Sequence, residues 1–174
     1  MRKSKRLLIR TVILTILLFL VGYTLYSNLF SDKNKGVREG DRATNFKLDT
    51  LEGNSVELSN LKGKLVLINF WGTWCKPCKD EMPAIQEVYN QYNKEGFEVL
   101  AINLGESDLV VKNFKQTTKV DIPILMDKDN VVTDLYDVYR LPSSFFINRD
   151  GEVVKIIEGQ LEEEALKDWV SNNL

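Results

Sequence analysis

Residues 64–93 decide the fold and read KLVLINFWGTWCKPCKDEMPAIQEVYNQYN. Residues 64–71 are almost entirely apolar and end at Gly72, which predicts a strand buried on both faces. Residues 76–93 then predict a helix. The sequence Cys75-Lys76-Pro77-Cys78 stands at the junction between these two elements.

The spacing of the two cysteines makes them a chemical pair. Cys75 precedes the helix, where unpaired N–H groups and the helix dipole stabilise a thiolate, and the neighbouring Lys76 favours the same charge. Cys78 stands one turn further along, within reach of a small disulfide with Cys75. Pro77 suits the first turn because no hydrogen bond needs its missing N–H there. A thiolate that attacks and a second thiol that resolves the mixed disulfide make a complete dithiol–disulfide couple.

A lone CxxC has other interpretations, and each of them lacks something in this chain. Half of a zinc site would need ligands from a second chain. Covalent haem attachment needs a histidine after the second cysteine, and Lys79 takes that place. A purely structural disulfide between neighbours so close in sequence would constrain the unfolded chain little. The position between a strand and a helix favours redox chemistry.

The composition of the 174 residues excludes several classes of site. No histidine is present, so there is no Ser-His-Asp or Cys-His nucleophile and no imidazole metal ligand. Two cysteines cannot build a tetrahedral structural zinc site within one chain. Proton transfer is left to carboxylates, lysine, tyrosine or the thiols, and we expect neither a metal nor a cofactor besides the redox pair.

Charge and hydropathy predict a membrane anchor at the N-terminus. Residues 1–10 hold five basic residues and no acidic one, and residues 11–30 (TVILTILLFLVGYTLYSNLF) are uncharged. Twenty such residues cross a bilayer core as one signal-anchor helix, with the basic end in the cytoplasm. A cleaved signal peptide is the alternative, but its apolar region would be shorter and would end in small residues, unlike Ser27–Phe30. Polar residues 31–40 predict a tether, and the remaining chain is expected on the extracytoplasmic side of the cell membrane.

Residues 41–174 form one predicted domain with a net negative charge, which argues against nucleic-acid binding. Strand-like and helix-like stretches alternate along it and indicate an α/β sheet of mixed direction. A hairpin is expected within residues 46–58, and a second hairpin turns at Asp150-Gly151. The other predicted elements are strands at 97–104, 122–125, 144–148 and 153–157, and helices at 107–118, 130–136 and 161–172.

Residues 70–78 (FWGTWCKPC) resemble the active-site segment of the thioredoxin superfamily, and nearly the whole chain resembles its membrane-anchored, extracytoplasmic TlpA/ResA branch. The resemblance extends to the N-terminal anchor, the first hairpin, the helical stretch after the second buried strand and the sequence Leu141-Pro142-Ser143-Ser144-Phe145. It implies a thioredoxin-like α/β fold, with a mixed sheet flanked by helices, an N-terminal β-hairpin and a helical insertion, preceded by one transmembrane helix.

The resemblance implies a role for each matching residue. Cys75 would be the attacking thiol and Cys78 the resolving thiol, with a redox disulfide between them. Pro142 matches the family's cis-proline, which presents backbone groups to an extended substrate, and Leu141 precedes it. Trp74 would form part of the exposed rim that meets the substrate.

Two glutamates are candidates for roles beside the thiols. Asn69 stands where thioredoxins have a buried aspartate, so that position cannot exchange a proton. The TlpA/ResA branch instead has a glutamate three residues after its second cysteine, and Glu81 stands there. Helical spacing puts Glu81 on the face of Cys78, where a carboxylate could exchange the proton of the thiol, although an exposed surface glutamate would show the same spacing. Glu106 would edge the substrate cavity, or would only add a favourable charge to the next helix.

The resemblance implies a monomeric, membrane-anchored thiol-disulfide oxidoreductase that reduces protein disulfides. The expected substrate is the haem-binding-site disulfide of apocytochrome c, and the expected electron donor is an integral-membrane protein of the CcdA type. A general or spore-envelope disulfide reductase is an alternative. A peroxiredoxin-like peroxidase is another, although Gly72 stands where that chemistry uses threonine. A non-catalytic Cu(I)-binding module is the last alternative, since two thiolates suit Cu(I).

Overall fold

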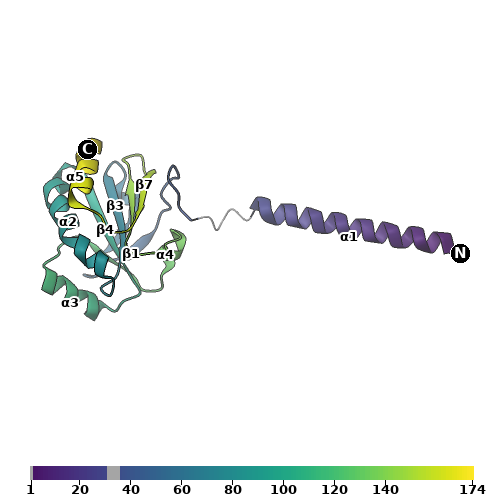
Figure 1. Cartoon of the computed structure of the whole chain (residues 1–174), viewed down its shortest axis with the longest axis horizontal. Helices are drawn as coiled ribbons and strands as arrows, with labels where there is room; N and C mark the ends of the chain where they lie inside the picture. Colours follow the sequence, from purple (N-terminus) through teal and green to yellow (C-terminus); the bar gives the residue numbers. More distant parts are fainter. Residues whose placement is uncertain (1, 31–35) are drawn as a thin grey trace. The chain divides into compact units, whose positions relative to one another are not determined.

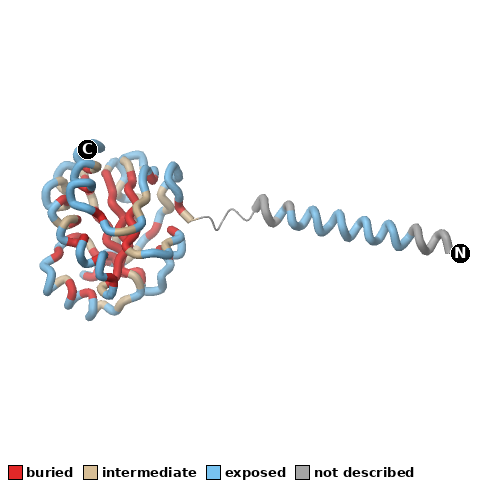
Figure 2. Tube along the Cα trace, in the orientation of Figure 1, coloured by how far each residue is buried: buried red, intermediate tan, exposed pale blue. Residues whose placement is uncertain are grey.

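The computed structural model describes residues 2–30 and 36–174. The chain divides into two compact units, Met1–Lys35 and Gly36–Leu174. Both cysteines belong to the second unit, so the functional site is sought there. In Figure 2, buried residues gather along the strands in the middle of this unit, and exposed residues line its outside.

The first unit contains the helix α1, Arg2–Phe30 (Figure 1). Within the part of the chain that the structure describes, no helix is both long enough and apolar enough to cross a membrane. The anchor predicted for residues 11–30 includes side chains outside the described residues, so it stays a prediction. Residues 31–35 of the predicted tether also lie outside the described residues.

The second unit is built on a five-stranded sheet in the order β5-β4-β3-β6-β7. Strands β3, β4 and β5 are parallel, and β6 and β7 are antiparallel to their neighbours. A separate antiparallel hairpin, β1-β2, precedes the sheet. The strands are β1 (Lys47–Asp49), β2 (Ser55–Glu57), β3 (Leu65–Trp71), β4 (Phe97–Leu104), β5 (Ile124–Asp127), β6 (Ser143–Ile147) and β7 (Val153–Glu158). The helices are α2 (Lys76–Tyr92), α3 (Asp108–Thr118), α4 (Val131–Leu135) and α5 (Glu163–Asn173), with short 3-10 helices at Leu58–Leu61 and Asn93–Glu95.

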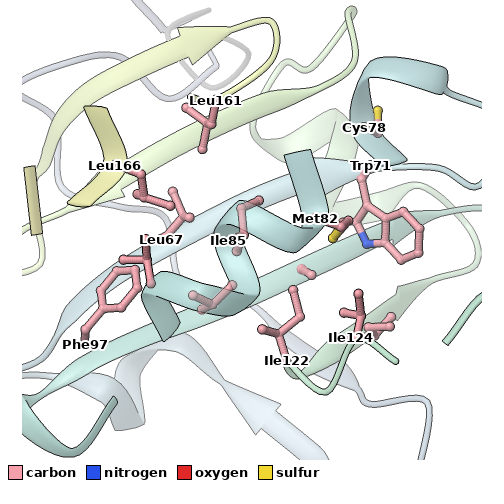
Figure 3. Packing of buried hydrophobic residues seen from close by; sticks show 14 of the residues in the cluster. Leu67, Trp71, Cys78, Met82, Ile85, Phe97, Ile122, Ile124, Leu161 and Leu166 are labelled. Atoms are coloured by element: carbon pink, nitrogen blue, oxygen red, sulfur yellow. The ribbon is translucent and has the colours of Figure 1, made fainter. Parts of the chain in front are cut away.

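Every residue of β3 is buried, because helices and the hairpin cover both faces of the sheet at this central strand. Side chains alternate between the faces. Leu65, Leu67 and Trp71 join a core cluster with α2 and α5, and Val66, Ile68 and Phe70 join a second cluster with α4 and the hairpin. Figure 3 shows the first cluster, in which Leu67 and Trp71 lie with residues of α2.

Helix α2 packs on the sheet through one face. Its buried residues are Cys78, Glu81, Met82, Ile85 and Val88, which follow the spacing of a single helical stripe. This stripe carries the second cysteine and Glu81 toward the sheet and places them in the same apolar surroundings. Helix α5 lies beside α2 on that face of the sheet (Figure 1).

The observed elements confirm the predicted thioredoxin-like α/β fold with its mixed sheet, N-terminal hairpin and helical insertion. Most of the observed boundaries lie within one or two residues of the predicted ones, and two of the differences have a clear physical reason. The compact unit begins at Gly36 rather than at residue 41, because Val37 is buried and the N–H of Gly40 donates to the carbonyl of Val153. Strand β5 begins two residues later than predicted, since Pro123 has no N–H to offer a neighbouring strand.

The topology brings distant segments to one end of the sheet. Parallel strands β3 and β4 end at the same edge, so the loops after Trp71 and after Leu104 lie together there. Strand β6 runs antiparallel to β3 and pairs Ser143 with Phe70, which brings the Leu141–Pro142 bond to the same edge. This edge holds the candidate site.

Candidate active site at the start of helix α2

Cys75 and Cys78 form a disulfide at the N-terminus of α2. Cys75 is the residue just before the helix, and its Sγ accepts a hydrogen bond from the N–H of Cys78 at 3.3 Å. Cys75 retains 6% exposure and Cys78 retains none, so Cys75 is the sulfur that a second molecule can approach. Figure 3 shows Cys78 at the end of the core cluster, beyond Trp71.

The turn before the helix sets the position of Cys75. The N–H of Cys75 donates to the carbonyl of Gly72 at 3.1 Å and closes the turn. A Cβ at Gly72 would meet the indole Nε1 of Trp74 at 2.8 Å, so a larger residue there would displace this indole. Trp74 is 67% exposed, as expected of a rim residue, whereas Trp71 is fully buried against Phe114.

Glu81 lies one turn after Cys78 and is fully buried. Its Oε1 accepts from Asn69 Nδ2 at 2.8 Å, and its Oε2 accepts from the N–H of Leu161 at 2.7 Å. Burial raises the pKa of Glu81 to about 7, although these two hydrogen bonds act in the opposite direction. A carboxyl group that titrates near neutral pH can both take and return a proton, so an inert surface glutamate is the wrong interpretation of this residue.

Asn69 has a role that the sequence did not reveal. The family resemblance marks Asn69 only as a position without an ionisable group, yet its side chain donates a hydrogen bond to the carboxyl group of Glu81. The same Nδ2 also donates to Ser144 Oγ at 3.0 Å, which ties the amide to β6. The second partner of Glu81, Leu161, lies 80 residues away along the chain, and no local sequence signal announces that contact.

Glu106 lies in the loop after β4, and its carboxylate contacts the segment in front of the cysteines. Oε2 accepts from the N–H of Thr73 at 2.7 Å and from Asn103 Nδ2 at 2.8 Å. Oε1 accepts from Thr73 Oγ1 at 2.5 Å. Glu106 is therefore engaged by donors of its own chain, which sequence reasoning about this loop missed.

The predicted influence of Lys76 on Cys75 is offset by a neighbour. Lys76 Nζ forms an ion pair with Asp80 Oδ2 at 2.5 Å, one turn along the exposed face of α2. The side chain of Lys76 is 82% exposed, so water screens its charge as well. Lys76 is a weak electrostatic partner for the thiolate.

Leu141 and Pro142 directly precede β6. The Leu141–Pro142 peptide bond is cis, and the carbonyl of Pro142 accepts from the N–H of Gly159 at 2.8 Å. Pro142 is buried and Leu141 is half-buried. The bond meets the edge of the sheet that holds the cysteines, and its contact with a substrate stays a prediction.

Among the described residues, no group of three or more cysteine or carboxylate side chains is placed to hold a metal ion. The acid–base groups at the site are the two thiols and the carboxyl groups of Glu81 and Glu106. The two cysteines can cleave and form a disulfide. Proton exchange between Glu81 and Cys78 stays a prediction.

Comparison with known proteins gives a consistent result. The AhpC/TSA family matches residues 39–156. The thiol-disulfide oxidoreductase ResA of Bacillus subtilis is 44% identical over 171 residues, which cover 98% of this chain and 95% of that protein. ResA of Geobacillus thermodenitrificans is 45% identical over 167 residues, covering 96% of this chain and 95% of that protein.

Solved structures agree with this result. The structure of the thiol:disulfide interchange protein DsbE from Chlorobium tepidum superimposes with a TM-score of 0.74 at 29% identity, covering 79% of this chain and 99% of that one. StoA from Bacillus subtilis gives a TM-score of 0.65 at 31% identity, covering 75% of this chain and 98% of that one. The chain therefore belongs to the AhpC/TSA family, has the thioredoxin-like fold, and is a thiol-disulfide oxidoreductase.

Proposed function

We propose that the chain is a membrane-tethered protein-disulfide reductase that works outside the cytoplasm and reduces the haem-binding-site disulfide of apocytochrome c. The observation that carries the reductase chemistry is the buried Glu81, which titrates near neutral pH one turn after Cys78. A dithiol with its own proton acceptor can complete a two-electron reduction without another cofactor.

The reaction begins from the reduced dithiol. The Cys75 thiolate attacks one sulfur of the substrate disulfide, and the substrate's other sulfur leaves as a thiolate. Cys78 gives its proton to the Glu81 carboxylate and attacks Cys75 Sγ, which forms the Cys75–Cys78 disulfide and releases the second substrate thiolate. Two electrons pass from the enzyme to the substrate. An integral-membrane donor of the CcdA type then supplies two electrons that break the Cys75–Cys78 disulfide, and Glu81 returns its proton to Cys78, so that Cys75 is again a thiolate.

The surroundings of the cysteines suit a protein substrate. Trp74 is exposed beside Cys75, and the cis bond between Leu141 and Pro142 meets the same edge of the sheet. An extended segment that carries a disulfide would lie across this edge, with its backbone beside Pro142 and one sulfur beside Cys75. Reduction of such a segment leaves the free thiols that covalent haem attachment requires.

Placement outside the cytoplasm rests on the N-terminal sequence. Residues 1–10 are basic, and residues 11–30 are uncharged and belong to the helix α1. A basic N-terminal flank favours an orientation with the N-terminus in the cytoplasm and the catalytic unit on the other side, as a single-pass membrane protein. A reductase is needed there because thiols outside the cytoplasm become oxidised.

The test traps the substrate on the enzyme in cells that express the full chain. Cys78→Ser leaves Cys75 unable to release its mixed disulfide, so the substrate stays bound. Apocytochrome c is the expected captured protein, and the double variant Cys75→Ser, Cys78→Ser should capture nothing. Capture of envelope proteins without any cytochrome would contradict the proposed substrate and support a general or spore-envelope reductase.

Two further measurements separate the remaining alternatives. Turnover of hydrogen peroxide at a rate comparable with that of protein disulfides would favour a peroxidase. Copper retained by the purified, reduced chain in a ratio near one, together with no disulfide reductase activity, would favour a Cu(I)-binding module.

A further inference from the structure

The segment from Gly72 to Cys75 includes both the exposed Trp74 and the attacking sulfur, and a carboxylate from the loop after β4 binds it. We propose that Glu106 is a positioning residue, whose carboxylate fixes the Gly72–Cys75 turn in the geometry that disulfide exchange requires. This inference goes beyond the proposed substrate and compartment, because it applies to any disulfide that Cys75 attacks.

The contacts of Glu106 converge on one residue of the turn. Both carboxylate oxygens bind Thr73, one through its backbone N–H at 2.7 Å and the other through Oγ1 at 2.5 Å. Thr73 is the second residue of the turn that the Cys75 N–H closes on the Gly72 carbonyl. A grip on both the backbone and the side chain of Thr73 removes the rotation that a single hydrogen bond would leave.

Glu106 is itself held by the neighbouring strand. Asn103 is fully buried at the end of β4, and its Nδ2 donates to Glu106 Oε2 at 2.8 Å. Asn103 pairs in register with Trp71, the last residue of β3. The chain of contacts therefore starts in the rigid sheet, passes through Asn103 and Glu106, and ends on Thr73, two residues before the reactive sulfur.

Fixing this turn has a consequence for the reaction rate. In disulfide exchange the attacking sulfur must approach nearly along the axis of the bond that breaks, so its position decides the rate. A displacement of about 1 Å in a reacting group can cost up to a hundredfold in rate. Thr73 and Cys75 belong to the same closed turn, so a free Thr73 would let Cys75 Sγ sample unproductive positions.

Substitution of Glu106 by glutamine distinguishes a positioning role from a role of the negative charge. In Glu106→Gln, the amide oxygen can accept from the Thr73 N–H and from Asn103, while the amide N–H₂ donates to Thr73 Oγ1, which is also an acceptor. Glutamine thus preserves the grip and removes the charge. Alanine removes both, and Thr73→Val removes the hydroxyl contact alone while keeping a side chain of similar shape.

The experiment measures the rate constant with which the reduced full chain reacts with oxidised glutathione, together with the thermal unfolding of each variant. Glu106→Ala should lower the rate constant about tenfold. Glu106→Gln should stay within about threefold of the parent chain, and Thr73→Val should fall between the two. Glu57→Gln is the matched control. Glu57 is the last residue of β2, outside the site, and its carboxylate accepts similar hydrogen bonds from Asn45 and Ser59.

The rate constants of these variants distinguish a positioning role of Glu106 from a structural or a charge role. Equal rate constants for the parent chain, Glu106→Ala and Thr73→Val would overturn the inference. Equal losses in Glu106→Gln and Glu106→Ala would also overturn it, since the carboxylate would then act by its charge or its proton. If Glu106→Ala fails to fold, the comparison of Thr73→Val with Glu106→Gln still decides, because a positioning role requires the first to be slower.

Discussion

Two carboxyl groups flank the redox pair, and they serve it in opposite ways. Glu81 lies beneath Cys78 on the buried face of α2, where groups from β3 and from the segment before α5 hold it in place. Glu106 lies in front of Cys75, where it holds another segment in place. The first accepts from two neutral groups in an apolar interior, and the second accepts from three donors at a half-buried loop.

The difference shows how burial assigns a role to a side chain. Two hydrogen bonds do not offset the loss of water around Glu81, so burial raises the pKa of its carboxyl group to about 7 and suits it to proton exchange. Glu106 is only half-buried, and its carboxylate oxygens accept hydrogen bonds from Thr73 and Asn103. The same residue type thus has a raised pKa in the buried site after Cys78 and binds the backbone before Cys75 at the other site.

The largest expected effect separates the two glutamates by the same substitution. Glu81→Gln removes the proton acceptor of Cys78 and should lower the rate of protein-disulfide reduction about a hundredfold near neutral pH. Glu106→Gln should change that rate by less than about threefold. Steady-state reduction of insulin disulfides by both variants checks this contrast. Equal losses of reduction rate in the two variants would contradict the different roles of the two carboxyl groups.

The next effect concerns stability against pH. Glu81 has a raised pKa in the folded, oxidised chain, so the folded state binds this proton more tightly than the unfolded state does. The stabilisation is complete below the ordinary carboxyl pKa and is lost as the pH rises to about 7. The free energy of unfolding should therefore fall by about 2 kcal/mol between about pH 5 and pH 8 because of this group. Urea unfolding of the oxidised chain measures it, and Glu81→Gln should lack this component.

A smaller effect tests the hold of Asn69 on Glu81. Asn69→Ala removes a hydrogen bond that favours the charged carboxylate, so the pKa of Glu81 should rise further. The midpoint of the pH–rate profile should move upward by about one pH unit. Ser144→Ala is the control, because it removes the other partner of Asn69 Nδ2 and leaves the bond to Glu81 intact. An unchanged midpoint in Asn69→Ala would show that burial and the Leu161 N–H set the pKa of Glu81 without a contribution from Asn69.

The contribution of Glu106 to stability should be smaller still. Glu106→Ala leaves the Thr73 N–H and Asn103 Nδ2 without their acceptor, but water reaches this half-buried loop. The free energy of unfolding should fall by about 1 kcal/mol. Chemical unfolding of the oxidised chain measures the loss. A value several times larger would mean that the variant disturbs the sheet, and its rate constant would then not report on the turn alone.

The smallest effect is expected on the exposed face of α2. Asp80→Asn removes the partner of Lys76, and an ion pair this exposed contributes less than about 0.5 kcal/mol. The unfolding free energy should barely change, and the rate of attack by Cys75 should rise slightly as the charge of Lys76 is freed. A large change in rate would show that water screens this charge less than its exposure indicates.

Local patterns predicted most of the elements because their signals are short in range. The buried strand at residues 64–71 and the helix after it follow from an unbroken apolar run and a helical stripe, and both are observed. Strand β4 was predicted with its observed limits for the same reason. The compact unit starts before residue 41, because Val37 is buried and both Glu39 and Gly40 form hydrogen bonds with β7.

The proximity of Cys75, Cys78 and Glu81 was also predictable, but the groups that hold Glu81 were not. Cys75, Cys78 and Glu81 lie within seven consecutive residues, so helical geometry alone relates them. The partners of Glu81 come from β3 and from the loop before α5. No pattern within one element encodes such contacts, because they depend on how separate elements pack.

Taken alone, the amino-acid sequence was enough to predict a strand–CxxC–helix unit, an α/β sheet and a thiol chemistry without histidine. Its periodicity and spacing act over a few residues, and those are the distances over which a strand, a helix or a CxxC pair forms. The tertiary structure decided which glutamate is buried and which one grips the turn before Cys75. Burial and long-range hydrogen bonds arise only when β3, β4 and the segment before α5 meet at one edge of the sheet, so only the folded chain distinguishes Glu81 from Glu106.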